Sequence, residues 1–61
     1  MLAVQRALLK LGFVVRPDGE MGAVTRRALE QYERDRGLPV DGRLTPKLVR
    51  RLSAETGISI D

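Results

Sequence analysis

Residues 37–46, GLPVDGRLTP, combine the signals that end one predicted helix and begin the next. Gly37, followed by a leucine, is typical of a Schellman stop, in which the glycine is left-handed and the next apolar residue folds back onto the last turn. Thr45-Pro46 combines a favoured N-cap with proline at the first helical position. Between these signals, Asp41-Gly42 is typical of a turn. The stretch predicts a helix, an ordered turn and a second helix.

The same punctuation recurs upstream at an offset of 23 residues. Asp18-Gly19 matches Asp41-Gly42, and Gly22 matches the N-cap at Thr45. A third copy begins at residues 57–61, which we interpret as a closing strand rather than the cut start of a further turn. Each predicted helix ends in glycine followed by a large apolar residue. These stops are Gly12-Phe13, Gly37-Leu38 and Gly57-Ile58.

Apolar residues repeat at helical spacing in three segments, which predicts helices near residues 2–11, 23–36 and 46–55. Each segment has one apolar stripe, and three short helices can bury such stripes only by converging on one core. The stripes are Val4, Ala7, Leu8 and Leu11; Thr25, Ala28, Leu29 and Tyr32; and Thr45, Leu48, Val49 and Leu52. We therefore expect an all-α fold in a single domain, residues 1–61, excised from a larger protein.

The composition limits the possible functions. The chain has neither cysteine nor histidine, so it forms no disulfide and we expect no structural zinc site, other metal or cofactor. No apolar run reaches the roughly 18 residues that span a bilayer, and no signal peptide is evident. The serines have no histidine to activate them, and a core this small leaves little room for a pocket, so we expect no catalytic residue and no enzyme activity. The net charge of +3 favours an anionic partner.

Several polar residues have both a functional and a structural interpretation. One interpretation of Asp18 and Asp41 is a carboxylate pair for acid–base catalysis, but turn formation explains both residues. Thr25 lies on a buried stripe, where we expect its hydroxyl to bond a carbonyl one turn back. Tyr32 could stack on a sugar, but we predict a core ring with an exposed hydroxyl. Gln5 could contact a glycan, and we favour a contact to loop backbone instead.

The third predicted helix has a basic face without local compensation. Lys47, Arg50 and Arg51 point away from its apolar stripe, and the acid near them is Glu55. This face could serve solubility alone, or it could attract an anionic polymer. On the second predicted helix the charges alternate in sign at four-residue spacing, which is typical of a solvated face.

The string from Leu8 to Leu52, about three-quarters of the chain, resembles the peptidoglycan-binding domain found beside many bacterial wall hydrolases and amidases. The resemblance lies in the order and spacing of small motifs rather than in one signature. The matching motif positions are Gly12, Asp18, Gly19, Gly22, Thr25, Gly37, Asp41 and Gly42. The family usually reads Phe-Gln in mid helix 2, where this chain has Tyr32-Glu33. If that amide touches ligand in relatives, Glu33 would disfavour an acidic stem peptide.

The resemblance implies a small three-helix orthogonal bundle with Asp-Gly turns, and a non-catalytic module that targets a larger envelope protein to the wall. The implied partner is a peptidoglycan glycan or stem peptide, and the implied location is the bacterial periplasm or cell wall. Glycan lactyl groups and stem-peptide carboxylates suit helix N-termini and arginines. We therefore predict a shallow ligand-binding groove at the starts of the second and third helices, with Arg16, Arg26 and Arg43.

Two other function classes stay open. A three-helix domain of pI about 10.2 could bind nucleic acid through its basic third helix. The long connection from Gly37 to Leu44 argues against this, because a helix-turn-helix joins its helices by about 3 or 4 residues. A protein-interaction module is the third possibility.

Overall fold

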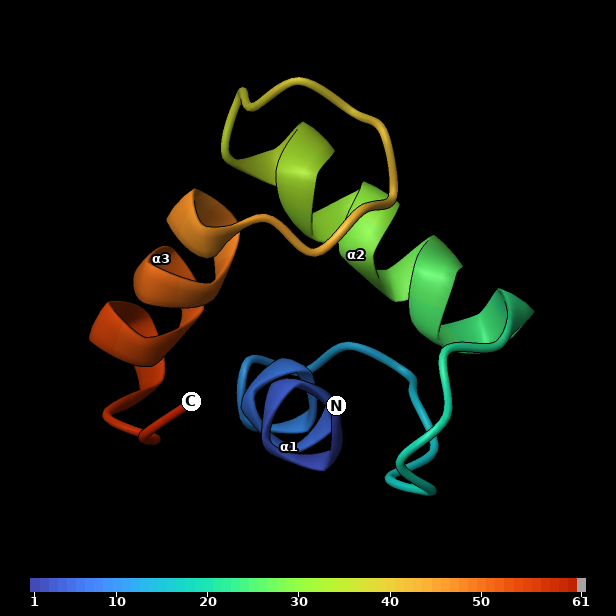
Figure 1. Cartoon of the computed structure of the whole chain (residues 1–61). Helices are drawn as coiled ribbons and strands as arrows, with labels where there is room; N and C mark the ends of the chain where they lie inside the picture. The colour runs from blue at the N-terminus through green and yellow to red at the C-terminus, as the bar shows by residue number, and fades with distance from the viewer. Residues whose placement is uncertain (61) are drawn as a thin grey trace.

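The computed structural model describes residues 1–60, which form three helices and no strand. These are α1 (Leu2–Lys10), α2 (Ala23–Asp35) and α3 (Pro46–Thr56), within one residue of the predicted bounds at each end. In Figure 1, α1 is seen end-on while α2 and α3 run across the view on either side of it, which is the predicted orthogonal arrangement. No helix in the described part of the chain is long and apolar enough to cross a membrane.

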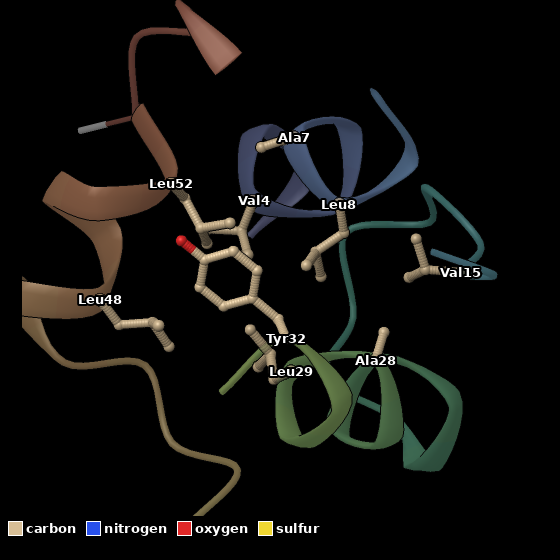
Figure 2. Close-up of a cluster of buried hydrophobic side chains, with 9 residues drawn as sticks. All are labelled: Val4, Ala7, Leu8, Val15, Ala28, Leu29, Tyr32, Leu48 and Leu52. Carbon is tan, nitrogen blue, oxygen red and sulfur yellow. The ribbon is translucent and has the colours of Figure 1, made fainter. Parts of the chain in front are cut away.

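The central helix of the bundle is α1, which packs against both of the others. The backbones of α2 and α3 do not approach each other closely. Side chains fill the space between them, and the Tyr32 ring lies there among aliphatic neighbours from all three helices (Figure 2). The buried apolar core is Val4, Ala7, Leu8, Val15, Ala28, Leu29, Tyr32, Leu48 and Leu52. Phe13 adds an edge-on contact to Tyr32, with ring centroids 6.0 Å apart.

The first two helices end in the predicted Schellman motif. At the end of α1, the Phe13 N–H donates to the Leu8 carbonyl and the Gly12 N–H to the Leu9 carbonyl, both at 3.0 Å. The same pair of bonds ends α2 at Gly37. Both glycines have a positive φ, as this motif requires.

The third stop differs from the prediction. The Gly57 N–H donates to the carbonyl four residues back, at 2.8 Å, which is the simpler left-handed cap with one backbone bond. The Thr56 hydroxyl accepts the Ile58 N–H at 3.1 Å and so replaces the second Schellman bond. The predicted closing strand is wrong for residues 57–60, where Ile58 and Ile60 pack on the core without strand structure, and Asp61 lies outside the described residues.

The helix starts are capped unequally. The Thr45 hydroxyl accepts the Leu48 N–H at 3.2 Å, and Pro46 occupies the first turn of α3, as predicted. Gly22 is the N-cap of α2 and offers no side chain to its free N–H groups. The ends of α1 and α3 are joined by Lys10, whose Nζ donates to the Thr56 carbonyl at 2.7 Å.

Candidate functional site

Gln5, on α1, organises the first loop, which precedes α2. Its Oε1 accepts the Gly19 N–H at 2.8 Å. Its Nε2 lies 3.0 Å from Asp18 Oδ1, 2.9 Å from the Glu20 carbonyl and 3.0 Å from Thr25 Oγ1. Gln5 is fully buried, so the amide bonds the loop and is not open to a glycan. The predicted contact to loop backbone is confirmed.

Thr25 is buried as predicted, but its hydroxyl has a different partner. It accepts from the Gln5 amide instead of bonding a carbonyl one turn back. Asp18 Oδ1 also accepts the Glu20 N–H at 2.9 Å. The hydrogen bond from the Glu20 N–H is the main reason why the pKa of Asp18 lies below its ordinary value, and the hydrogen bond from Gln5 is the second.

Glu33, on α2, organises the second loop, which precedes α3. Its Oε1 accepts the N–H groups of Gly42, at 3.0 Å, and Asp41, at 3.3 Å. Glu33 is only 4% exposed, and burial raises the pKa of its carboxyl, with the neighbouring Asp41 carboxylate adding to the effect. The sequence led us to consider Glu33 as a ligand contact but did not reveal this role in the loop.

Within residues 1–60, neither Asp-Gly pair lies in a β-turn that is closed by a backbone hydrogen bond from residue i+3 to residue i. The aspartate side chains close the loops locally instead. Asp41 Oδ1 accepts the Arg43 N–H at 3.0 Å, as Asp18 does from its second neighbour. Both glycines have positive φ. The predicted bond from each aspartate to its own loop backbone is therefore present.

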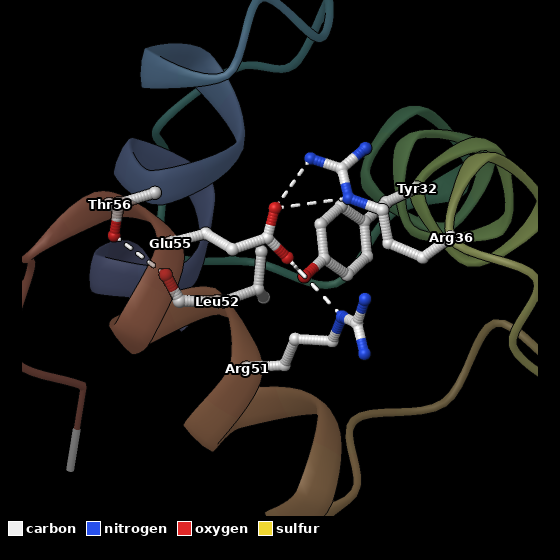
Figure 3. A network of polar contacts seen from close by, with 6 residues as sticks. All are labelled: Tyr32, Arg36, Arg51, Leu52, Glu55 and Thr56. Carbon is white, nitrogen blue, oxygen red and sulfur yellow. Dashed lines mark hydrogen bonds and ion pairs between the residues drawn. The ribbon is translucent and has the colours of Figure 1, made fainter.

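Glu55, on α3, is the centre of a polar network that joins α2 and α3 (Figure 3). It accepts the Tyr32 hydroxyl and two bonds from the Arg36 guanidinium, at 2.7 and 3.0 Å. Arg51 adds an ion pair at 3.4 Å. The pKa of Glu55 is lowered mainly by the hydrogen bonds from Arg36, with a smaller effect of the one from Tyr32. Burial is the main cause that raises the pKa of Tyr32 to about 12, and the hydrogen bond to Glu55 adds to it.

This network corrects two predictions. The Tyr32 hydroxyl is not exposed to solvent: it donates to Glu55, and the whole residue is 0% exposed. The basic face of α3 is partly compensated, because Arg51 pairs with that acid. Arg36, which sequence reasoning missed, lies over the Tyr32 ring with its guanidinium carbon 4.6 Å from the ring centroid.

Two surface hollows lie at the starts of α2 and α3. The first-loop hollow, of about 250 Å³, is lined by Arg16, Asp18, Glu20, Gly22, Ala23, Val24 and Thr25. The second-loop hollow, of about 170 Å³, is lined by Glu33, Leu38, Pro39, Asp41, Thr45, Lys47, Leu48 and Arg51. Each contains the aspartate of its loop and the N-cap residue of the helix that follows.

The three arginines predicted to bind ligand do not share one hollow. Arg16 lines the first-loop hollow. Arg26 lies against the second loop instead, since a Cβ on Gly42 would be 3.0 Å from the Arg26 Cγ. Arg43 is exposed beside Gly42 and, like Arg26, lines neither hollow. The geometry therefore brings Arg26 and Arg43 to the same loop and leaves Arg16 at the other.

Residues 1–52 match the family model "Putative peptidoglycan binding domain". The chain belongs to this family. No curated protein and no solved structure gave a significant match.

The match extends over α1, α2 and most of α3 of this peptidoglycan-binding domain, and so includes both loops and both hollows. Membership supports peptidoglycan as the ligand and association with the cell wall. Domains of the family are binding modules. Among residues 1–60, no three acidic side chains gather closely enough to hold a metal ion.

Proposed function

We propose that this peptidoglycan-binding domain is a non-catalytic module that holds a larger envelope protein on the bacterial wall, in the periplasm or on the wall itself. The observation that carries the proposal is the family match over residues 1–52. The structure contributes shallow hollows at two helix starts rather than a deep cleft. Shallow hollows suit the binding of an extended polymer, whereas enclosed clefts are typical of catalysis.

The proposed ligand contacts are Arg16, Arg26 and Arg43. The carboxylates of stem peptides are anions, which arginine side chains bind in bidentate geometry. The start of α2 adds free N–H groups, because Gly22 provides no side-chain cap. Arg16 lies at that start, and the other two arginines lie at the second loop, next to the start of α3.

A nucleic-acid function is less well supported. Residues 36–45 separate α2 from α3, whereas a helix-turn-helix has about 3 or 4 connecting residues. Of the basic residues on α3, Arg51 is already paired with Glu55.

Retention on purified peptidoglycan sacculi, with DNA-cellulose in parallel, tests the proposal. We expect retention on sacculi that falls in Arg26→Ala and Arg43→Ala but persists in Arg27→Ala, a control with an exposed arginine on the same helix. The triple variant Lys47→Gln, Arg50→Gln, Arg51→Gln should still bind. The sacculi should release no soluble fragments during incubation.

Other outcomes are informative. Retention lost in the triple variant but unchanged in both alanine variants would move the binding surface to α3. Binding to DNA that falls with log salt at a slope of about −0.9 per phosphate contact would favour the nucleic-acid function. Absence of wild-type retention on sacculi would overturn the proposal.

A further inference from the structure

The second-loop hollow combines an apolar floor with walls of opposite charge. Leu38, Pro39 and Leu48 provide the apolar surface. The acids Glu33 and Asp41 come from α2 and the loop, while the cations Lys47 and Arg51 stand one turn apart on α3. The volume of about 170 Å³ is below the roughly 300–1,000 Å³ of sites that enclose a drug-sized ligand, so the hollow fits one side chain.

The acidic wall has an oxygen that the fold does not use. Both backbone N–H groups that reach Glu33 bond its Oε1, and within residues 1–60 its Oε2 has no hydrogen-bond partner. Every solvent-inaccessible side-chain oxygen of residues 1–60 has a hydrogen-bond partner. Because Glu33 Oε2 has none, it must be in contact with solvent. Glu33 is one of the residues that line the hollow. A ligand donor there would meet a buried carboxylate beside a second one, Asp41.

The cationic wall is only partly neutralised. Arg51 shares Glu55 with Arg36, which has the shorter contacts to that acid. Lys47 has no ion-pair partner within residues 1–60 and is exposed. A ligand carboxylate near α3 would therefore meet unsatisfied positive charge, while an ammonium on the opposite side would meet unsatisfied negative charge.

We infer that the second-loop hollow binds one amino acid of a peptidoglycan stem peptide, whose aliphatic side chain carries an ammonium group. In this arrangement the methylene stem lies on Leu38, Pro39 and Leu48, the ammonium meets Glu33 and Asp41, and a carboxylate of the peptide meets Lys47. This rests on the proposed function and assigns the peptide, rather than the neutral sugar, to this hollow. A sugar hydroxyl would leave two adjacent carboxylates without a cation.

The residue at position 33 accounts for the preference for an ammonium group. A neutral glutamine there would still offer an oxygen to the loop N–H groups. A carboxylate at position 33 gives the loop no advantage in stability, because burying it beside the Asp41 carboxylate is unfavourable. A ligand ammonium offsets that cost, because it brings the opposite charge to both acids.

The test uses the whole chain and three synthetic tetrapeptides. With acetylated N-termini, Ala-Glu-Lys-Ala carries an ammonium only on its lysine, Ala-Glu-norleucine-Ala carries none on a similar stem, and Ala-Glu-Lys-Ala amide lacks the terminal carboxylate. Calorimetry at neutral pH should show the lysine peptide binding about tenfold more tightly than the norleucine peptide, as expected of one charge-assisted bond. The amide should bind more weakly than the free acid, and Lys47→Gln should remove that difference.

Glu33→Gln is the decisive variant, because it retains the oxygen that holds the second loop. It should lose most of the tenfold discrimination, because Asp41 alone then faces the ammonium. Asp35→Asn, the same change from carboxylate to amide at an exposed position of α2 that lines neither hollow, is the matched control and should keep the tenfold discrimination. Equal binding of both peptides by the wild type, or undiminished discrimination in Glu33→Gln, would overturn the inference.

Sacculi retention separates this inference from the proposed function. Wild-type retention on sacculi without lysine discrimination overturns the peptide assignment and leaves the wall-binding function in place. Loss of wild-type retention overturns the wall function, and the peptide assignment with it.

Discussion

The two loops share the Asp-Gly pair and a buried side chain that holds it, but they differ in the chemistry of that side chain. Gln5 is an amide, so it accepts from the first loop and also donates to Asp18 and Thr25. Glu33 can only accept when ionised, so it holds two N–H groups and repels Asp41. The same backbone task is done by an amide without a charge cost and by a carboxylate with one.

The difference gives the loops opposite responses to pH. The pKa of Asp18 lies below its ordinary 3.8, so the unfolded chain binds the proton first and the first loop loses stability as pH falls below that value. The pKa of Glu33 lies above its ordinary 4.5, so the folded state binds the proton first. The second loop therefore loses stability as pH rises above 4.5.

The largest effect should come from the core on which both loops rest. Leu29 lies on α2 and is fully buried in the core. Leu29→Ala should cost roughly 2–5 kcal/mol of unfolding free energy, as deletion of a buried leucine does. In a domain this small, thermal unfolding should lose its cooperative transition. A variant melting near the wild-type temperature would contradict the burial of Leu29.

Exchanging the two chemistries should be strongly asymmetric, and the larger effect is at the first loop. Gln5→Glu removes the donors to Thr25 and the Glu20 carbonyl and places a carboxylate beside Asp18. We expect a loss of about 2 kcal/mol or more at neutral pH, measured by urea unfolding. Gln31→Glu, the same change at an exposed position, is the control. Equal losses in both variants would show that the Gln5 network contributes little.

The reverse exchange should be nearly neutral and should remove a pH dependence. Glu33→Gln keeps the acceptor for Asp41 and Gly42, so its unfolding free energy should stay within about 1 kcal/mol of wild type. Burial destabilises the Glu33 carboxyl only when it is ionised. The variant should therefore become more stable relative to the wild type as pH rises above 4.5. Thermal melts from pH 4 to 7 measure this gap. A gap that narrows with rising pH would refute the assigned cause.

The smallest effects concern the helix that each loop introduces. Thr45→Ala removes the side-chain cap of α3 and should cost about 1 kcal/mol. Gly22→Ser should gain a few tenths of a kcal/mol, because the position is extended and a Cβ there meets nothing within 4 Å. Chemical denaturation measures both. A serine variant less stable than wild type would show that the start of α2 does not accept a side-chain cap.

Local signals predicted most of the fold. The glycine stops, the N-caps of the second and third helices and the apolar spacing of the first indicated the three helices to within one residue. Thr56 altered the third stop, because its hydroxyl competes for a backbone N–H that the glycine pattern assigns to a carbonyl. The Gln5 contact could be foreseen because a polar residue at a buried position of a short helix needs loop partners.

Long-range pairing could not be predicted in the same way. Tyr32 lies on the apolar stripe, but its hydroxyl meets Glu55, 23 residues away, and this depends on how α3 crosses. Glu33 lies beside the stripe, and only the path of the second loop brings two N–H groups to it. The three arginines were chosen for closeness to helix starts in sequence, whereas side-chain direction places Arg26 against Gly42 and outside both hollows.

The position of α1 has a consequence for synthesis on the ribosome. α1 is made first and touches both later helices, and its last residue bonds Thr56, 46 residues further along. α2 and α3 meet through side chains, around Tyr32 and Glu55, rather than through close backbone contact. Because α3 supplies Leu48 and Leu52 to the common core, the nascent chain should complete its fold only after α3 has left the exit tunnel.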